Sequence, residues 1–113
     1  MVNSYASEED LTRAYNQRLD LLSQTIEARK IEIGARESSL SKLVAQAAEL
    51  ERSGKAVSDA LKQMISSERV EIDRQKQFMA RKEAEKSVAK SDYDRDMAKY
   101  KAALERSKEA KGD

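Results

Sequence analysis

The 113-residue sequence contains no cysteine, histidine, proline or tryptophan. Without cysteine or histidine the chain has no thiol nucleophile, no disulfide, no imidazole acid or base and none of the usual zinc ligands. Only 39% of the residues are apolar and 38% are charged, whereas globular domains are about half apolar and about a quarter charged. A thick compact core is therefore not expected, and neither is most of the enzyme chemistry that operates at neutral pH.

Charge of one sign and long apolar runs are also missing. The 22 lysine and arginine residues are balanced by 21 aspartate and glutamate residues, whereas a nucleic-acid-binding domain usually gathers a basic excess on one face. No apolar run is long enough to span a membrane, and Met1–Ser4 have neither the basic nor the apolar region of a signal peptide. We therefore expect no nucleic-acid partner, no transmembrane segment and no signal peptide in this sequence.

The sequence does contain a regular spacing of apolar side chains. From Thr12 to Leu50, apolar or long side chains recur at alternating steps of three and four residues, which is typical of the a and d positions of a coiled coil. A looser stripe begins at Leu61, with polar interruptions and a shift of phase between Met79 and Ala89. This periodicity predicts two long helices and argues against disorder, which high charge and few aromatic residues would otherwise suggest.

Capping signals locate the ends of the two helices. Ser7 is followed by three acidic residues, as at a helix N-terminus, and Ser58 is followed by one in the same way. Ser53 and Gly54 follow the last leucine of the first stripe, and Val57 can supply an apolar contact across the turn. The sequence therefore predicts a first helix over about residues 7–52, a turn over 53–57 and a second helix over about 58–110.

Because the turn is short, the two helices must lie antiparallel. Residues 1–113 are therefore expected to form a single all-α module, an antiparallel two-helix coiled-coil hairpin. The alternative is an open, longer parallel coil, but the capping context of Gly54 favours the hairpin. The residues expected in the interhelix core are Tyr15, Leu19, Leu22, Ile26, Ile33, Leu40, Leu43, Ala47, Leu50, Leu61, Ile65, Ile72, Phe78, Met79, Ala89, Tyr93, Met97 and Tyr100.

Individual positions along the stripes lead to more specific expectations. Tyr15 is expected to lie near the Met97 side chain, and Gly34 is expected to make room for the only phenylalanine on the opposing helix. Arg29 and Arg36 occupy d positions, where they either extend their charged ends to solvent or pair with acids of the opposing helix and fix the register. Extension to solvent is the preferred interpretation, because the middle of the hairpin is expected to pack weakly.

A single hairpin buries one stripe of each helix and leaves other aliphatic side chains uncovered. Those expected to be uncovered are Leu21, Ile31, Val44 and Val70. A homodimer that forms a four-helix bundle is the economical way to cover them. We therefore expect a homodimer, together with a protein partner that the sequence does not identify.

The clusters of charged residues have no spacing that favours chemistry. Asp92, Asp94 and Asp96 do not converge on a helix, and their segment lacks the glycine and the terminal glutamate of a calcium loop. The basic residues of the second helix are interleaved with acids, as on a solvated surface, with a phosphate or anionic-lipid surface as the alternative. The tyrosines, Tyr5 included, are expected to pack rather than to form a docking site. No catalytic residue, metal site or cofactor is therefore expected.

Three stretches of the sequence together resemble a known group of proteins: residues 5–11, residues 50–57 and residues 92–100. They look like the coiled-coil tail of uncharacterised proteobacterial exported proteins that carry a small N-terminal β-module, a domain of unknown function. Such tails often have proline in the turn, where this chain has Ala56 or Ser58. The resemblance implies that the chain is a fragment of a longer exported protein of the periplasm or cell envelope, and it implies no activity.

The function expected from the sequence is that of a non-enzymatic structural or interaction module. Such a hairpin dimerises, acts as a spacer or docks a partner through helix association. The alternative is an export-apparatus stalk or a chaperone-like hairpin, similar to the charged coiled coils of flagellar and type III export machinery. Both interpretations predict a helical binding surface in place of an active site.

Overall fold

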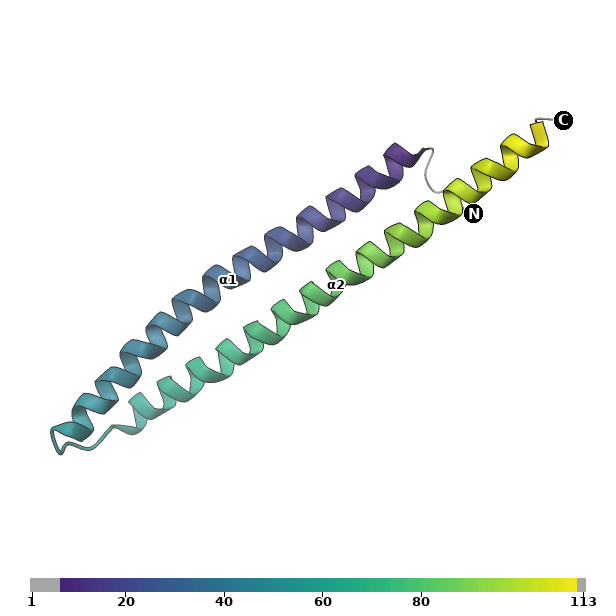
Figure 1. Cartoon of the computed structure of the whole chain (residues 1–113). Coiled ribbons are helices and arrows are strands. Elements are labelled where there is room, and N and C mark those ends of the chain that lie inside the picture. Colours follow the sequence, from purple (N-terminus) through teal and green to yellow (C-terminus); the bar gives the residue numbers. More distant parts are fainter. Residues whose placement is uncertain (1–6, 112–113) are drawn as a thin grey trace. The chain divides into compact units, whose positions relative to one another are not determined.

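The computed structural model describes residues 7–111, so Tyr5 and residues 112–113 lie outside the described residues. Helix α1 spans Glu8–Arg52, helix α2 spans Asp59–Lys111, and a short turn joins them (Figure 1). These bounds differ by at most one residue from those expected from the sequence. Residues 7–111 contain no strand. The fold is therefore the expected all-α antiparallel hairpin of two helices.

The hairpin is divided into two compact units, each of which contains a piece of both helices. The turn-side unit is Thr25–Arg81, and the terminal unit joins the residues up to Gln24 to those from Lys82 onward. Each unit has its own contacts between α1 and α2.

Serine side chains cap the N-termini of both helices, as the sequence predicts. The backbone N–H of Asp10 donates to Ser7 Oγ at 3.2 Å, and that of Leu61 donates to Ser58 Oγ, also at 3.2 Å. Each donor lies three residues after its serine, which is the position that an N-cap side chain reaches. The acidic residues in the first turn of each helix add a favourable interaction with the helix dipole.

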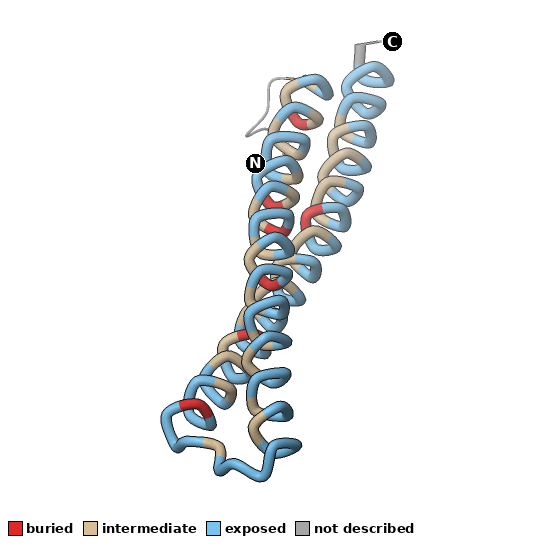
Figure 2. Tube along the Cα trace, turned by 90° about the vertical axis from the view of Figure 1, so that its left-hand side faces the viewer, coloured by how far each residue is buried: buried red, intermediate tan, exposed pale blue. Residues whose placement is uncertain are grey.

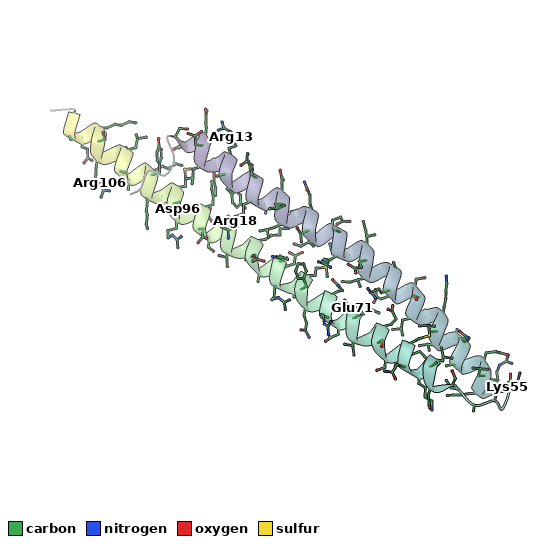
Figure 3. The ribbon with its side chains drawn as sticks, turned by 180° about the vertical axis from the view of Figure 1, so that it is seen from behind. Arg13, Arg18, Lys55, Glu71, Asp96 and Arg106 are labelled. Atoms are coloured by element: carbon green, nitrogen blue, oxygen red, sulfur yellow. The ribbon has the colours of Figure 1, made fainter. Side chains whose placement is uncertain are left out.

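Gly54 ends α1 in a left-handed conformation, with φ at +74°. The Lys55 N–H donates to the Leu50 carbonyl at 2.8 Å, and the Gly54 N–H donates to the carbonyl three residues before it at 3.0 Å. These two bonds form a Schellman motif, which satisfies carbonyl groups that the end of a helix leaves free. Of the other expected turn residues, Ser53 is exposed and Val57 is half-buried. Lys55, labelled in Figure 3, marks the outer end of the turn.

Burial follows one narrow stripe along each helix, and buried residues are separated by half-buried and exposed ones (Figure 2). Of the expected core residues, six are buried: Leu22, Ile26, Ile33, Leu61, Ile72 and Ala89. The other twelve are half-buried: Tyr15, Leu19, Leu40, Leu43, Ala47, Leu50, Ile65, Phe78, Met79, Tyr93, Met97 and Tyr100. Leu11, which is only 4% exposed, is a buried residue that the stripe did not include. It precedes the first a position and lies beside Ala89 and Tyr93.

The stripe of α2 keeps one phase along the helix, so the expected shift between Met79 and Ala89 is wrong. Steps of three and four residues lead from Met79 through Lys82 and Lys86 to Ala89, and both lysines are half-buried. Lysine can cover apolar neighbours with its aliphatic stem while its charged end points away. Counting only apolar residues therefore made an unbroken stripe look interrupted.

Gly34 does not make room for Phe78, contrary to the expectation. It is exposed, and a Cβ atom at this position would meet nothing within 4 Å. The Phe78 ring instead lies against two guanidinium groups, with Arg29 Cζ 4.3 Å and Arg81 Cζ 5.9 Å from its centroid. Adjacent helix residues point about 100° apart, so the neighbour of the buried Ile33 is turned away from the opposing helix.

Candidate functional site

A connected group of polar side chains links the two helices within the turn-side unit. Arg36 donates from Nη1 to Glu68 Oε1 on α2 at 2.8 Å and from Nε to Glu32 Oε1 on α1 at 3.5 Å. Arg29 Nη1 donates to Glu32 Oε2 at 3.1 Å and to Gln75 Oε1 on α2 at 2.7 Å. These five side chains form the interhelix polar network.

The network corrects the preferred interpretation of the two arginines at d positions. The side chains of Arg29 and Arg36 are each 33% exposed, so they are held at the edge of the stripe and do not extend fully into solvent. The alternative interpretation, an ion pair with an acid of the opposing helix, is correct for Arg36. Arg29 instead donates to the amide oxygen of Gln75 on that helix. Gln75 is in turn oriented by its Nε2, which donates to Glu71 Oε1 at 3.0 Å (Glu71 is labelled in Figure 3). Such partly exposed polar contacts select a register more than they add stability.

Aromatic contacts join the helices in the terminal unit. The rings of Tyr15 and Tyr93 are stacked, with centroids 4.4 Å apart and planes at 20°. The hydroxyls of Tyr93 and Thr12 lie 2.9 Å apart and share a hydrogen bond. Tyr15 was expected near Met97, which follows Tyr93 by one helical turn. The ring contact of Tyr15 is therefore one helical turn away from the expected register.

The aspartates near the end of α2 lie next to basic side chains. Asp92 accepts from Arg95 Nη2 at 3.0 Å and from Arg18 Nη1 of α1 at 3.4 Å. Asp94 accepts from Lys90 Nζ at 2.9 Å, and this hydrogen bond raises the pKa of the exposed lysine above its usual 10.5. Within residues 7–111, no three acidic, cysteine or histidine side chains are placed so that they could hold a metal ion. These aspartates therefore act as members of ion pairs on the helix surface.

A shallow hollow of about 500 Å³ opens on one side of the turn-side unit. Its apolar lining comes from both helices and from the turn: Val44, Ala47, Ala48, Val57, Ile65 and Val70. The lining also includes Ser66 and three charged residues, Glu51 of α1 and Lys62 and Arg69 of α2. We call this feature the turn-side hollow. It brings the expected turn residue Val57 together with two members of the expected core.

Large aliphatic side chains are exposed in both units. Ile31 is 69% exposed and Leu21 is 66% exposed, and the two valines expected to be uncovered are exposed as well. The full set in the described part of the chain is Leu21, Ile31, Val44, Met64, Val70, Val88 and Leu104. Sequence reasoning missed Met64, Val88 and Leu104, which it placed in or beside the stripe of the second helix.

Neither described helix combines the length and the apolar character needed to cross a membrane. No protein-family model, curated protein or solved structure matches the chain. The function is therefore inferred from the geometry alone.

Proposed function

We propose that this chain is a non-enzymatic interaction module, a helical hairpin that dimerises with a second copy of itself. The observation that carries the proposal is the exposure of large aliphatic side chains, among them Val44 at 38% and Val70 at 54%. Removing such a side chain from water stabilises an assembly by roughly 1.5–3 kcal/mol when burial is complete. Association into a four-helix bundle covers these side chains at the lowest structural cost.

The thin core of the hairpin supports the same proposal. Only seven of the described residues are buried, all of them aliphatic. One stripe per helix gives little buried apolar area for the backbone entropy that long helices lose on folding. A second hairpin adds a second apolar layer, and the helices gain stability from it.

The polar groups of the described residues favour a structural role over a catalytic one. The arginines of the interhelix polar network and the aspartates near the end of α2 have partners of opposite charge. Catalytic acids and bases are usually held in a cleft with a strongly perturbed pKa. Ion-paired side chains on a narrow helix pair instead direct how helices associate.

Sedimentation equilibrium over a range of concentrations tests this function. We expect a species of twice the chain mass of 12.8 kDa to form as the concentration rises. The midpoint of thermal unfolding should rise with it, because a partner that binds only the folded state stabilises that state. A monomer with a constant midpoint up to millimolar concentration would exclude the proposed dimer.

A further inference from the structure

We propose that the turn-side hollow binds a second copy of this chain, with the two turns at the same end of the dimer. This inference rests on the proposed function and adds the contact surface and the orientation. All residues that line the hollow belong to the turn-side unit.

The lining of the hollow suits an apolar side chain from another helix. Val44 on the α1 side is 38% exposed and Val70 on the α2 side is 54% exposed. Half-buried Val57 and Ile65 belong to the same lining. A largely apolar hollow formed by two helices and a turn, with a few charged residues in its lining, is typical of a protein contact surface.

The charged residues that line the hollow are divided by sign between the two helices. Glu51 lies on the α1 side, and Lys62 and Arg69 lie on the α2 side. No ion pair joins any of these three side chains to another residue of the 7–111 range. The hollow therefore presents an acidic side chain from α1 and basic side chains from α2, all available to a partner.

In a symmetric dimer, this division of charge between the helices determines which orientation of the two copies is favoured. When two copies face each other, the twofold axis lies in the plane of contact. An axis along the helices places α1 of one copy against α2 of the other, so that Glu51 meets Lys62 of the second copy and both turns lie at the same end. An axis across the helices places α2 against α2, which brings Lys62 and Arg69 toward their own equivalents. Opposite charges attract and like charges repel, so the first arrangement is favoured.

Small side chains on the same side of α1 allow a second helix to come close. Ala48 lines the hollow, and Ser41 and Gly34 precede it at intervals of seven residues, which keep nearly the same direction on a helix. All three are exposed. Close approach of a second copy would account for glycine at position 34, where the hairpin itself leaves space for a larger side chain.

A matched pair of valine substitutions tests the position of the contact. Val70 and Val88 are 54% and 52% exposed, but only Val70 lines the hollow. We expect Val70→Glu to weaken dimerisation by about tenfold or more, and Val88→Glu to change it less than about twofold, with equal helicity by circular dichroism. If the chain is a dimer and Val88→Glu weakens it as much as Val70→Glu does, the hollow is the wrong surface and the proposed function stands. A monomeric wild-type chain would overturn both.

A charge exchange and a distance measurement test the orientation. Glu51→Lys should weaken the dimer by about threefold or more, and adding Lys62→Glu should restore it, because the exchanged charges again attract each other. The chain has no cysteine, so Lys30→Cys accepts a single spin label within the turn-side unit. At ~1.5 Å per residue, turns at the same end place the two labels less than about 30 Å apart, whereas the opposite orientation places them about 50 Å apart. The longer distance would overturn the inferred orientation.

Discussion

Two glycines in the same half of the chain have different physical roles. Gly54 has φ at +74° and donates one of the two bonds of the Schellman motif. Gly34 lies within α1, with open space where a side chain would begin. The first role is local and can be predicted from the sequence, because Gly54 comes shortly after the last apolar residue of the stripe. The second depends on which way one helix residue points, so the expectation that Gly34 makes room for Phe78 was wrong.

Replacing Gly34 by alanine should stabilise the hairpin. A glycine within a helix is about 1 kcal/mol less favourable than alanine, and the added methyl group meets no neighbour within 4 Å. We expect the free energy of unfolding in urea to rise by about 1 kcal/mol in Gly34→Ala. The measurement should be made at a concentration at which the chain is monomeric. A loss of stability would show that the side chain meets an obstacle in the folded hairpin.

The same substitution at Gly54 should have the opposite effect. A residue with a Cβ atom in the left-handed conformation costs about 1–2 kcal/mol. Gly54→Ala should therefore lower the free energy of unfolding in urea by about that amount, with helicity retained. Gly34→Ala is the matched control, since it adds the same methyl group at a glycine inside α1, where the backbone is helical. Equal effects of the two substitutions would contradict the distinction drawn between the glycines.

The shared hydrogen bond of Tyr93 should be measurable as a loss of stability. Tyr93→Phe removes the hydroxyl that lies 2.9 Å from Thr12 Oγ1 and keeps the stacked ring. We expect it to cost about 0.5–1.5 kcal/mol in urea unfolding. Tyr100→Phe is the control, because this half-buried tyrosine has no hydrogen bond to the other described residues. Equal losses in both variants would assign the effect to tyrosine hydration in general.

At the scale of the helices, the sequence predicts the ends of each helix and its apolar stripe better than it predicts the contacts between the helices. Ser7 and Ser58 accept from backbone groups three residues away, so sequence spacing determines their role. The choice of partners for Arg29 and Arg36 depends on side chains distant in the sequence. Glu68 is one of the polar residues that interrupt the apolar stripe of α2, and its carboxylate accepts from Arg36 of α1 at 2.8 Å.

The Ser58 cap should contribute to the stability of α2. Ser58→Ala removes the oxygen that accepts from the Leu61 N–H, and loss of an N-cap costs about 1 kcal/mol. Thermal unfolding followed by circular dichroism should show a lower midpoint for this variant. Ser67→Ala, at an exposed position inside α2, should instead leave the midpoint unchanged or slightly higher, because alanine favours helix. If the two variants behave alike, the cap contributes nothing.

At the scale of the whole molecule, the residue types that are missing allow the fold to form. Two helices of 45 and 53 residues have no proline to interrupt them, and the balanced charges supply ion pairs within and between helices. Composition and periodicity were therefore enough to predict the hairpin. They were not enough to predict the hollow, because its lining combines side chains of α1, the turn and α2 that only the folded register brings together.

The interhelix polar network should lower the free energy of unfolding of the hairpin while it fixes the register of the helices. Replacing Arg36 and Glu68 together by leucine removes a charged pair whose side chains are 33% and 21% exposed and extends the apolar stripe. We expect the double variant to gain about 1 kcal/mol or more in urea unfolding, whereas Arg36→Leu alone should lose stability because Glu68 is left without its partner. Sedimentation velocity should show the double variant spread over several oligomeric species, since an uninterrupted apolar stripe no longer favours one alignment. A single, sharply defined species with the stability gain would show that register is fixed elsewhere in the hairpin.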